Sequence, residues 1–314
     1  MTLKLGIGLP QTRNFGRRDV VTAARACEEI GFDSLWVFER ILLPEDQSGP
    51  HGLYGAPGLP WPERYSGVAD PLLTLAAAAA VTERAELGSC VLLPPLHLPF
   101  ALARTLAGLD ALSNGRVLAG LGTGWSIDEY AAVAPRPFAE RGAALDEFLD
   151  LAAAVWGPDP VTFENERYRI APAQVGPKPA RRIPLLLAGT NHRALSRVAR
   201  RADGWLMTGA PPAHVGATLS RVRDMAAKAG RNPADLTGYF QLAVTSLTEA
   251  PPAGRAPYGG SIPQLVDDIA ALAEAGVGHV FVQLSNVTHN VTELLAHAAA
   301  LHAATREAGL LRSA

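Results

Sequence analysis

Cysteine is scarce in this chain of 314 residues, which has two copies, Cys27 and Cys90. Both lie in apolar segments, and neither belongs to a CxxC pair or to a spacing typical of metal ligands. The cysteine pattern therefore argues against a disulfide framework and against a cysteine-based metal site. It fits a reducing compartment, and because no basic start precedes an apolar run, we expect a cytoplasmic protein without a signal peptide.

The sequence also lacks a long hydrophobic run and an excess of charge of one sign. Leu72–Val81 is apolar and alanine-rich, but Glu83 and Arg84 end it far short of a membrane span, so a buried helix is expected there. The formal net charge is −2. Neither a membrane nor nucleic acid is therefore expected as a partner.

Short apolar segments of strand length alternate with helical segments along the whole chain. Eight such units predict a closed (β/α)8 barrel, a TIM barrel of the α/β class. No stretch resembles a domain linker, so we expect a single domain over residues 1–314. The predicted strands are Leu3–Leu9, Ser34–Phe38, Leu87–Leu93, Val117–Leu121, Ile183–Ala188, Gly204–Met207, Tyr239–Thr245 and Val280–Leu284.

Two segments fall outside this alternation. Val161–Glu164 and Arg167–Ile170 flank Asn165-Glu166 and predict a small β-hairpin. Gln47–Ser66 is rich in glycine, proline and aromatic residues. A loop of this length in a compact domain is usually functional or disordered, and we expect it to cross the mouth of the barrel.

The active site of a (β/α)8 barrel lies at the C-terminal ends of its strands. The residues there include one carboxylate, one guanidinium, one indole and one imidazole, but no metal-ligand cluster and no Ser/His/Asp triad. Such a set suggests that a bound cofactor supplies the chemistry. The residues selected are Pro10, Gln11, Glu39, Arg40, Leu93–His97, Gly122–Trp125, Gly189–Asn191, Thr208, Gly209, Thr245, Ser246, Ser285 and Asn286.

Two strand ends have the composition of ligand-binding turns. Gly120, Gly122 and Gly124 alternate before Ser126 and a helix start, where missing Cβ atoms let a flat cofactor or an anion approach the backbone. A tight turn without a ligand is the alternative. After Ala188, the run Gly189–Asn191 precedes a second helix. It predicts either a phosphate cradle of backbone N–H groups or an ordinary helix N-cap made by Thr190 or Asn191.

The stretch ALSNGRVLAGLGTGWSIDEY resembles the bacterial luciferase-like monooxygenase superfamily of flavin and deazaflavin enzymes. The resemblance is nearly full-length and includes LGIGLP, GFDSLWVFER and GPKPARRIPLLLAGT. Within it, the chain is most similar to the branch expected to use coenzyme F420 for hydride transfer to or from a small organic substrate. The resemblance implies a TIM barrel with insertion loops at the mouth and a homodimer, and the small side chains of Leu72–Val81 permit close packing. An oxygen-dependent monooxygenase using reduced FMN and a catalytically silent ligand-binding member are the alternatives.

The resemblance also implies roles at the end of the second strand. The F420 branch commonly carries Trp-Val-x-Glu-His there, and this chain has Arg40 in place of the histidine. Glu39 is implied to meet the edge of the cofactor ring, and Glu39 and Arg40 are the candidate catalytic pair. Arg40 then meets Glu39, an anionic substrate or the reduced cofactor. The alternative is an ion pair on the surface, which would contribute little to stability.

Further cofactor contacts are implied at the next two strand ends. In the family, the third strand carries a non-proline cis peptide behind the central ring, which matches Cys90–Val91 or Ser89–Cys90 here. Thr123, Gly124 and Trp125 end the fourth strand, and Trp125 is either a cofactor contact or a core anchor. Glu129 is expected to cap or brace the helix that follows. Aromatic and imidazole side chains on nearby loops either line a substrate pocket or lie on the surface: Tyr54, Trp61, Tyr65 and His97.

Overall fold

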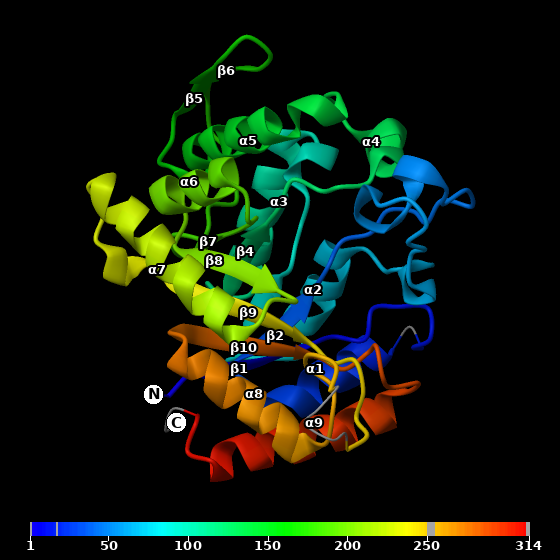
Figure 1. The fold of residues 1–314 in the computed structure, drawn as a ribbon. Helices are drawn as coiled ribbons and strands as arrows, with labels where there is room; N and C mark the ends of the chain where they lie inside the picture. The colour runs from blue at the N-terminus through cyan, green and yellow to red at the C-terminus, as the bar shows by residue number, and fades with distance from the viewer. Residues whose placement is uncertain (1, 17, 250–254, 312–314) are drawn as a thin grey trace.

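Eight parallel strands close into a barrel in the computed structural model, which describes residues 2–16, 18–249 and 255–311. Going round the barrel, the strand order is β1-β10-β9-β8-β7-β4-β3-β2 (Figure 1). This arrangement confirms the predicted TIM barrel. The barrel strands are β1 (Lys4–Gly8), β2 (Ser34–Val37), β3 (Glu86–Ser89), β4 (Val117–Leu121), β7 (Leu185–Ala188), β8 (Gly204–Thr208), β9 (Thr237–Ala243) and β10 (Val277–Gln283).

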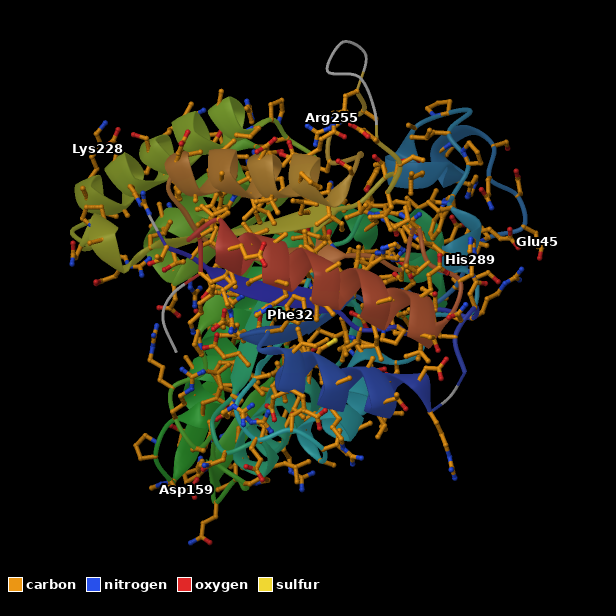
Figure 2. All side chains as sticks on the ribbon, turned by 90° about the horizontal axis from the view of Figure 1, so that it is seen from below. Phe32, Glu45, Asp159, Lys228, Arg255 and His289 are labelled. Carbon is orange, nitrogen blue, oxygen red and sulfur yellow. The ribbon has the colours of Figure 1, made fainter. Side chains whose placement is uncertain are left out.

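Helices cover the outside of the barrel. Seen from below in Figure 2, α1, α8 and α9 lie side by side across the strands. The short helix α4 (Ile127–Val133) lies instead near the mouth, beside the long loop. The covering helices are α1 (Asp19–Ile30), α2 (Pro71–Ala79), α3 (Pro99–Leu112), α5 (Arg141–Trp156), α6 (His192–Arg201), α7 (Pro212–Lys228), α8 (Ile262–Glu274) and α9 (Val291–Glu307).

Aromatic side chains fill the interior of the barrel. Trp36 stacks on Phe281 with ring centroids 4.0 Å apart. The Trp36 Nε1 donates to Ser34 Oγ at 2.7 Å, and that hydroxyl lies 2.6 Å from His279 Nε2, so the buried polar atoms have partners. A Cβ atom on Gly88 would press against the Trp36 ring, which is why glycine occupies that position. Because the interior is filled, open space remains at the strand ends.

The third strand is shorter than the predicted Leu87–Leu93. It ends at Ser89, and the Cys90–Val91 peptide bond that follows is cis, as the family resemblance implied. The backbone rejoins the barrel at one bridge, between Leu92 and Leu121. Pro94 and Pro95, which cannot donate a backbone hydrogen bond, then begin the short 3₁₀ helix η4 (Pro94–Leu96). The apolar composition alone did not reveal this early end.

Two segments leave the barrel, as expected. Strands β5 (Val161–Glu164) and β6 (Arg169–Ala173) form an antiparallel hairpin beside α5, confirming the hairpin with its second strand shifted along the chain. Residues 47–66, called the mouth loop below, contain the 3₁₀ helices η1 (Gly49–His51), η2 (Leu53–Gly55) and η3 (Glu63–Tyr65). Two further 3₁₀ helices are η5 (Phe138–Glu140) and η6 (Pro233–Asp235).

Leu72–Val81, expected as a buried helix, has one open face. Helix α2 covers Pro71–Ala79, and although Leu75 and Ala78 are buried, the Leu73 side chain is 74% exposed. Leu112, at the end of the neighbouring α3, is also exposed. No helix among the described residues is long and apolar enough to cross a bilayer.

Candidate active site at the barrel mouth

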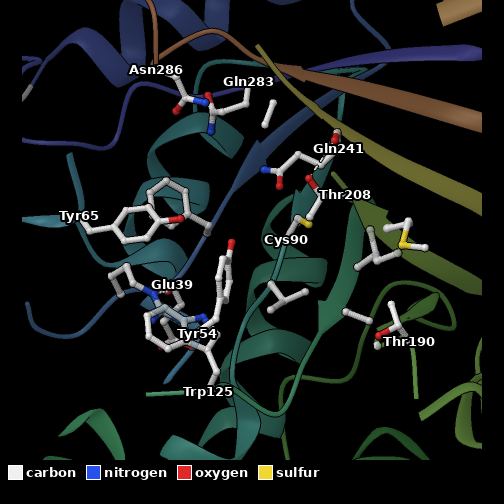
Figure 3. A pocket seen from close by; sticks show the side chains of 18 of the residues that line it. Glu39, Tyr54, Tyr65, Cys90, Trp125, Thr190, Thr208, Gln241, Gln283 and Asn286 are labelled. Carbon is white, nitrogen blue, oxygen red and sulfur yellow. Dashed lines mark hydrogen bonds between the residues drawn. The ribbon is translucent and has the colours of Figure 1, made fainter. Parts of the chain in front are cut away.

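A cavity of about 330 Å³ opens at the C-terminal ends of the strands. Figure 3 shows Glu39, Tyr54 and Trp125 grouped on one side of it, with Thr190 on the opposite side and Cys90 between them. Twelve of the predicted site residues border the cavity: Glu39, Arg40, Tyr54, Tyr65, Cys90, Val91, Trp125, Ala188, Gly189, Thr190, Thr208 and Asn286. Residues from the ends of several strands, which the barrel rule singled out, therefore meet around one cavity.

The other residues predicted to bind cofactor or substrate do not border the cavity. Ser89 is buried and donates its hydroxyl to the Gly120 carbonyl at 2.8 Å. The Thr123 carbonyl accepts from Tyr130 Oη at 2.5 Å, and Gly124 is next to it with a φ of +72°. Trp61, Asn191 and His97 also stand outside the lining, and their contacts are described below.

Glu39 follows the end of β2 and is 4% exposed. Its Oε2 accepts from the Leu93 backbone N–H at 2.6 Å, and its Oε1 lies 2.7 Å from His97 Nε2. Burial lowers the pKa of His97, but the hydrogen bond and charge of Glu39, with a smaller contribution from Asp70, outweigh it, so this pKa is raised. Glu39 and His97 therefore form a carboxylate–imidazole pair that favours the protonated ring.

Arg40 pairs with Glu129 and not with Glu39. Its Nη1 lies 2.9 Å from Glu129 Oε2, at ion-pair distance but not aligned as a linear hydrogen bond, and the two side chains are 8% and 1% exposed. Its Nε donates to the Glu39 carbonyl at 2.7 Å. Of the partners considered for Arg40, the Glu39 side chain is therefore not the one that it meets, and the Arg40–Glu129 pair is not on the surface.

Aromatic rings enclose the Arg40 guanidinium. Its Cζ lies 4.8 Å from the Trp125 ring centroid, 5.7 Å from that of Trp61 and 5.9 Å from that of Tyr65. These distances are within the range of cation–π attraction. Trp61 and Tyr65 belong to the mouth loop, so the guanidinium ties the loop to the barrel. Trp61, expected on the surface or in a substrate pocket, is 5% exposed and packs against Trp125.

Glu129 has a larger role than bracing its own helix. Ser126 caps α4 by accepting from the Glu129 backbone N–H at 3.2 Å. The Glu129 carboxylate instead accepts from the Ile41 N–H at 2.8 Å and meets Arg40. Burial raises the pKa of Glu129, and the Arg40 charge opposes this shift. The sequence spacing of 89 residues between these partners gave no indication of their contact.

The Cys90 thiol borders the cavity but is not activated. Burial raises its pKa to about 12, so the thiol remains protonated near neutral pH. With Val91 and Leu206, it supplies an apolar surface in the middle of the cavity. The arrangement favours contact with a flat apolar group over nucleophilic catalysis.

Polar side chains, most of them amides, form one wall of the cavity, and the sequence predicted some of them. Asn286 and Thr208 were selected as strand-end residues, whereas Gln241 and Gln283, which also border the cavity, were missed. Both glutamines are polar residues near the end of otherwise apolar strands, which is the signal that was available. Ser285 Oγ donates to Gln283 Oε1 at 2.9 Å, and Asn286 Oδ1 is buried without a partner among the described residues.

The opposite end of the cavity has the features of an anion site. Asn191 is the N-cap of α6 and accepts from the Ala194 N–H at 2.9 Å, so Thr190 is not needed as the cap. Gly189 has a φ of +136°, and a Cβ atom there would collide with Ala194. The remaining N–H groups of the first helical turn have no partner within the helix and favour negative charge.

These residues fit a flavin or deazaflavin. The cavity has an apolar middle for a flat ring, amide side chains for its polar edge and a helix N-terminus for a phosphate. The glycine at position 189 keeps the backbone free of a side chain at that turn. Metal chemistry has no such support, because the described part of the chain contains no group of three or more potential ligands among His, Cys, Asp and Glu.

Comparison with protein families and curated proteins gives clear matches. The family model described as luciferase-like monooxygenase matches residues 4–253. The Mycobacterium tuberculosis protein Rv0953c is 36% identical over 261 residues, which are 82% of this chain and 84% of that protein. The F420-dependent glucose-6-phosphate dehydrogenase of Nakamurella multipartita is 32% identical over 240 residues, 75% of this chain and 66% of the enzyme.

Solved structures share the fold at lower identity. The F420-dependent secondary alcohol dehydrogenase, solved with an F420–acetone adduct, has a TM-score of 0.76 at 18% identity, covering 98% of this chain and 100% of that one. The monooxygenase RslO1 from Streptomyces bottropensis has a TM-score of 0.74 at 22% identity, covering 97% and 98%. At these identities the likeness concerns the fold.

Proposed function

This chain belongs to the luciferase-like monooxygenase family, and from that premise we propose that it is an F420-dependent oxidoreductase. It would transfer a hydride between the deazaflavin and a small organic substrate. The relative that supports this choice of cofactor is the F420-dependent dehydrogenase at 32% identity. The observation that carries the proposal is the cavity itself, which joins an apolar middle to a helix N-terminus at one end and the buried Glu39 at the other.

The cavity residues divide into those that hold the cofactor and those that face the substrate. Cys90, Val91 and Ala188 would contact the flat ring, and the turn Gly189–Asn191 would hold its phosphate. When bound, F420 supplies a carbon that accepts or donates the hydride. Glu39 and Arg40 are the proposed catalytic residues, with Tyr65 at the substrate side and Thr123, Gly124 and Ser89 supporting the strand ends behind.

Two charged side chains at the mouth, Glu39 and Arg40, are suited to support hydride transfer. Glu39 is held by two hydrogen bonds and Arg40 by an ion pair, so both charges are fixed before a ligand enters. Preorganised charges of this kind cost little reorganisation during the reaction. The mouth loop, through Trp61 and Tyr65, would exclude water from the reacting atoms.

Cofactor titration with tryptophan fluorescence tests the proposal. Trp125 borders the cavity, so binding of F420 is expected to quench its emission. A Trp125→Phe variant should lose most of the quenching. Trp156→Phe is the matched control, because Trp156 lies outside the barrel and donates to the Ala103 carbonyl at 2.8 Å. Absence of F420 binding, or quenching that survives in Trp125→Phe, would contradict this placement.

A monooxygenase using reduced FMN and oxygen is the second candidate. The family description favours it, since the matching family is named for monooxygenases. The same titration with FMN, followed by oxygen consumption with the reduced flavin, separates the two. Tight FMN binding with substrate-dependent oxygen uptake would replace the F420 proposal.

We also propose that the protein is a homodimer through the open face of α2 and α3. Leu73 and Leu112 are 74% and 65% exposed, and a groove beside them is lined mainly by apolar side chains. A second copy of the chain that covered this face would remove both leucines from water. The groove residues are Leu72, Leu73, Ala76, Arg104, Thr105, Gly108, Leu109, Leu112 and Pro177.

A further inference from the structure

His97 stands between the mouth cavity and a second, smaller cleft on the outside of the barrel. Glu39 borders the mouth, and His97 borders the outer cleft, where its side chain is 28% exposed. A single hydrogen bond of 2.7 Å, from His97 Nε2 to Glu39 Oε1, joins the two side chains. The hydrogen-bonded pair Glu39–His97 therefore reaches from one space to the other.

The imidazole is the side chain suited to such a position. It can bind a proton at one ring nitrogen and release one from the other near neutral pH. Nε2 is engaged with Glu39, and the described residues offer Nδ1 no hydrogen-bond partner, while the side chain as a whole is 28% exposed.

We propose that Glu39 and His97 form a proton route from the reaction chamber to the outer cleft. The proposal rests on the proposed hydride-transfer function, because that reaction must also move a proton. In the oxidising direction, the C–H bond of an alcohol breaks with its electron pair going to the cofactor as hydride, and the O–H proton goes to Glu39. The alcohol becomes a carbonyl compound, and the reverse direction delivers the proton instead.

The proton balance closes over one turnover. The resting pair is Glu39 carboxylate with protonated His97. When Glu39 takes up the substrate proton, the negative charge that favours protonated His97 disappears, and His97 releases a proton from Nδ1 into the outer cleft. A half turn of the neutral ring about its Cβ–Cγ bond then brings the unprotonated Nδ1 to Glu39, which passes its proton to that nitrogen. The resting pair is restored, and one proton has crossed.

The surroundings of His97 allow this cycle. Burial works against a charged ring, but Glu39 and the more distant Asp70 raise the pKa of His97 overall. On the cleft side, Arg136 forms ion pairs with both Glu140, at 2.8 Å, and Glu147, at 3.2 Å, so its charge is compensated there. Among the neighbouring charges, Glu39 makes the largest contribution to the raised pKa of His97. The groups facing His97 from the packed elements are Glu39, Asp70, Arg136, Glu147 and Tyr168.

The first test is an NMR titration of the histidine ring carbons in the protein without cofactor, with His97 assigned by its loss in His97→Gln. Replacing Glu39 with Gln removes its negative charge, so the His97 midpoint should fall by about one pH unit or more. Glu147→Gln is the matched control and should move it by less than about half of that. An unchanged midpoint in Glu39→Gln would overturn the proposed coupling.

The second test measures single-turnover hydride transfer with F420 and an alcohol that the wild type oxidises. His97→Gln should slow the step about 10-fold and raise its solvent deuterium isotope effect, while F420 affinity stays within about 2-fold. Added imidazole should restore part of the rate in His97→Ala. The exposed His214→Gln on α7 is the control and should behave as wild type.

Equal rates and isotope effects in wild type and His97→Gln would show that the proton leaves by another path. If instead the proposed function is wrong, the wild-type protein will not bind F420 at all, which distinguishes that failure from a failure of the proton route. The histidine titration needs no cofactor and reports on the pair in either case.

Discussion

Arg40 Nη1 lies 2.9 Å from Glu129 Oε2, and both side chains are buried beneath the mouth loop. The pair joins the end of β2 to the start of α4. Removing the arginine would leave the Glu129 carboxylate, and not that of Glu39, without its counter-charge. Arg40 thus links the position of the mouth loop to the charge balance of the chamber.

Replacing Arg40 with Ala is expected to impair both stability and turnover. Breaking a buried ion pair from one side costs about 3–5 kcal/mol, and a 10-fold loss of kcat/KM corresponds to ~1.4 kcal/mol. Urea unfolding and steady-state kinetics measure the two effects. Arg182→Ala is the control, because it breaks an ion pair with Asp203 in which Arg182 is 72% exposed, and should cost less than about 1 kcal/mol. Equal stability losses in the two variants would contradict the buried role of Arg40.

Replacing Thr190 with Asp is expected to weaken cofactor binding by at least about 10-fold, because it places a carboxylate where the phosphate is proposed to bind. Thr190→Asn has a similar shape without the charge and should bind F420 within about 3-fold of wild type. Asn191 remains the N-cap in both variants, so α6 should be preserved. Fluorescence titration gives the affinities. If Thr190→Asp binds as tightly as wild type, the phosphate lies elsewhere.

The raised pKa of His97 is expected to make the folding stability depend on pH. Its pKa in the folded protein is raised above the ordinary value of 6.5, so the folded state holds this proton more tightly than the unfolded chain does. The resulting stabilisation is complete below pH 6.5 and is lost as the pH rises through the folded-state pKa. The stability difference between wild type and His97→Gln should therefore shrink from pH 5.5 to pH 9. A difference that is constant or grows with pH would argue against the raised pKa.

Replacing Leu73 with Asp is expected to dissociate the proposed dimer, because it places a charge in the middle of the apolar face. Size-exclusion chromatography with light scattering should then report a particle near 33.0 kDa instead of twice that mass. Val133→Asp on α4 is the control, since Val133 is also exposed but lies away from the α2–α3 groove. A wild type that already runs as a monomer would remove the proposal.

The order of elements was readable from the sequence because it depends on local patterns. Each barrel strand is a short apolar run, and alternation with helices admits few closed arrangements. Once the barrel is inferred, the rule that barrel active sites lie at the C-terminal ends of the strands selects Glu39, Trp125 and Gly189. The cis bond at Cys90–Val91 came from the family resemblance, since nothing in the local composition specifies it.

The partners of the charged residues could not be predicted in this way. Arg40 and Glu129 are 89 positions apart, and Glu39 and His97 are 58 apart. Sequence patterns specify which face of an element is buried, but which buried charges meet depends on how loops from different units fold over the same mouth. By itself the sequence determined the barrel, its mouth and the residues at its strand ends. Only the tertiary structure decided that Arg40 pairs with Glu129 and Glu39 with His97, because a buried charge takes the nearest partner in space and not in sequence.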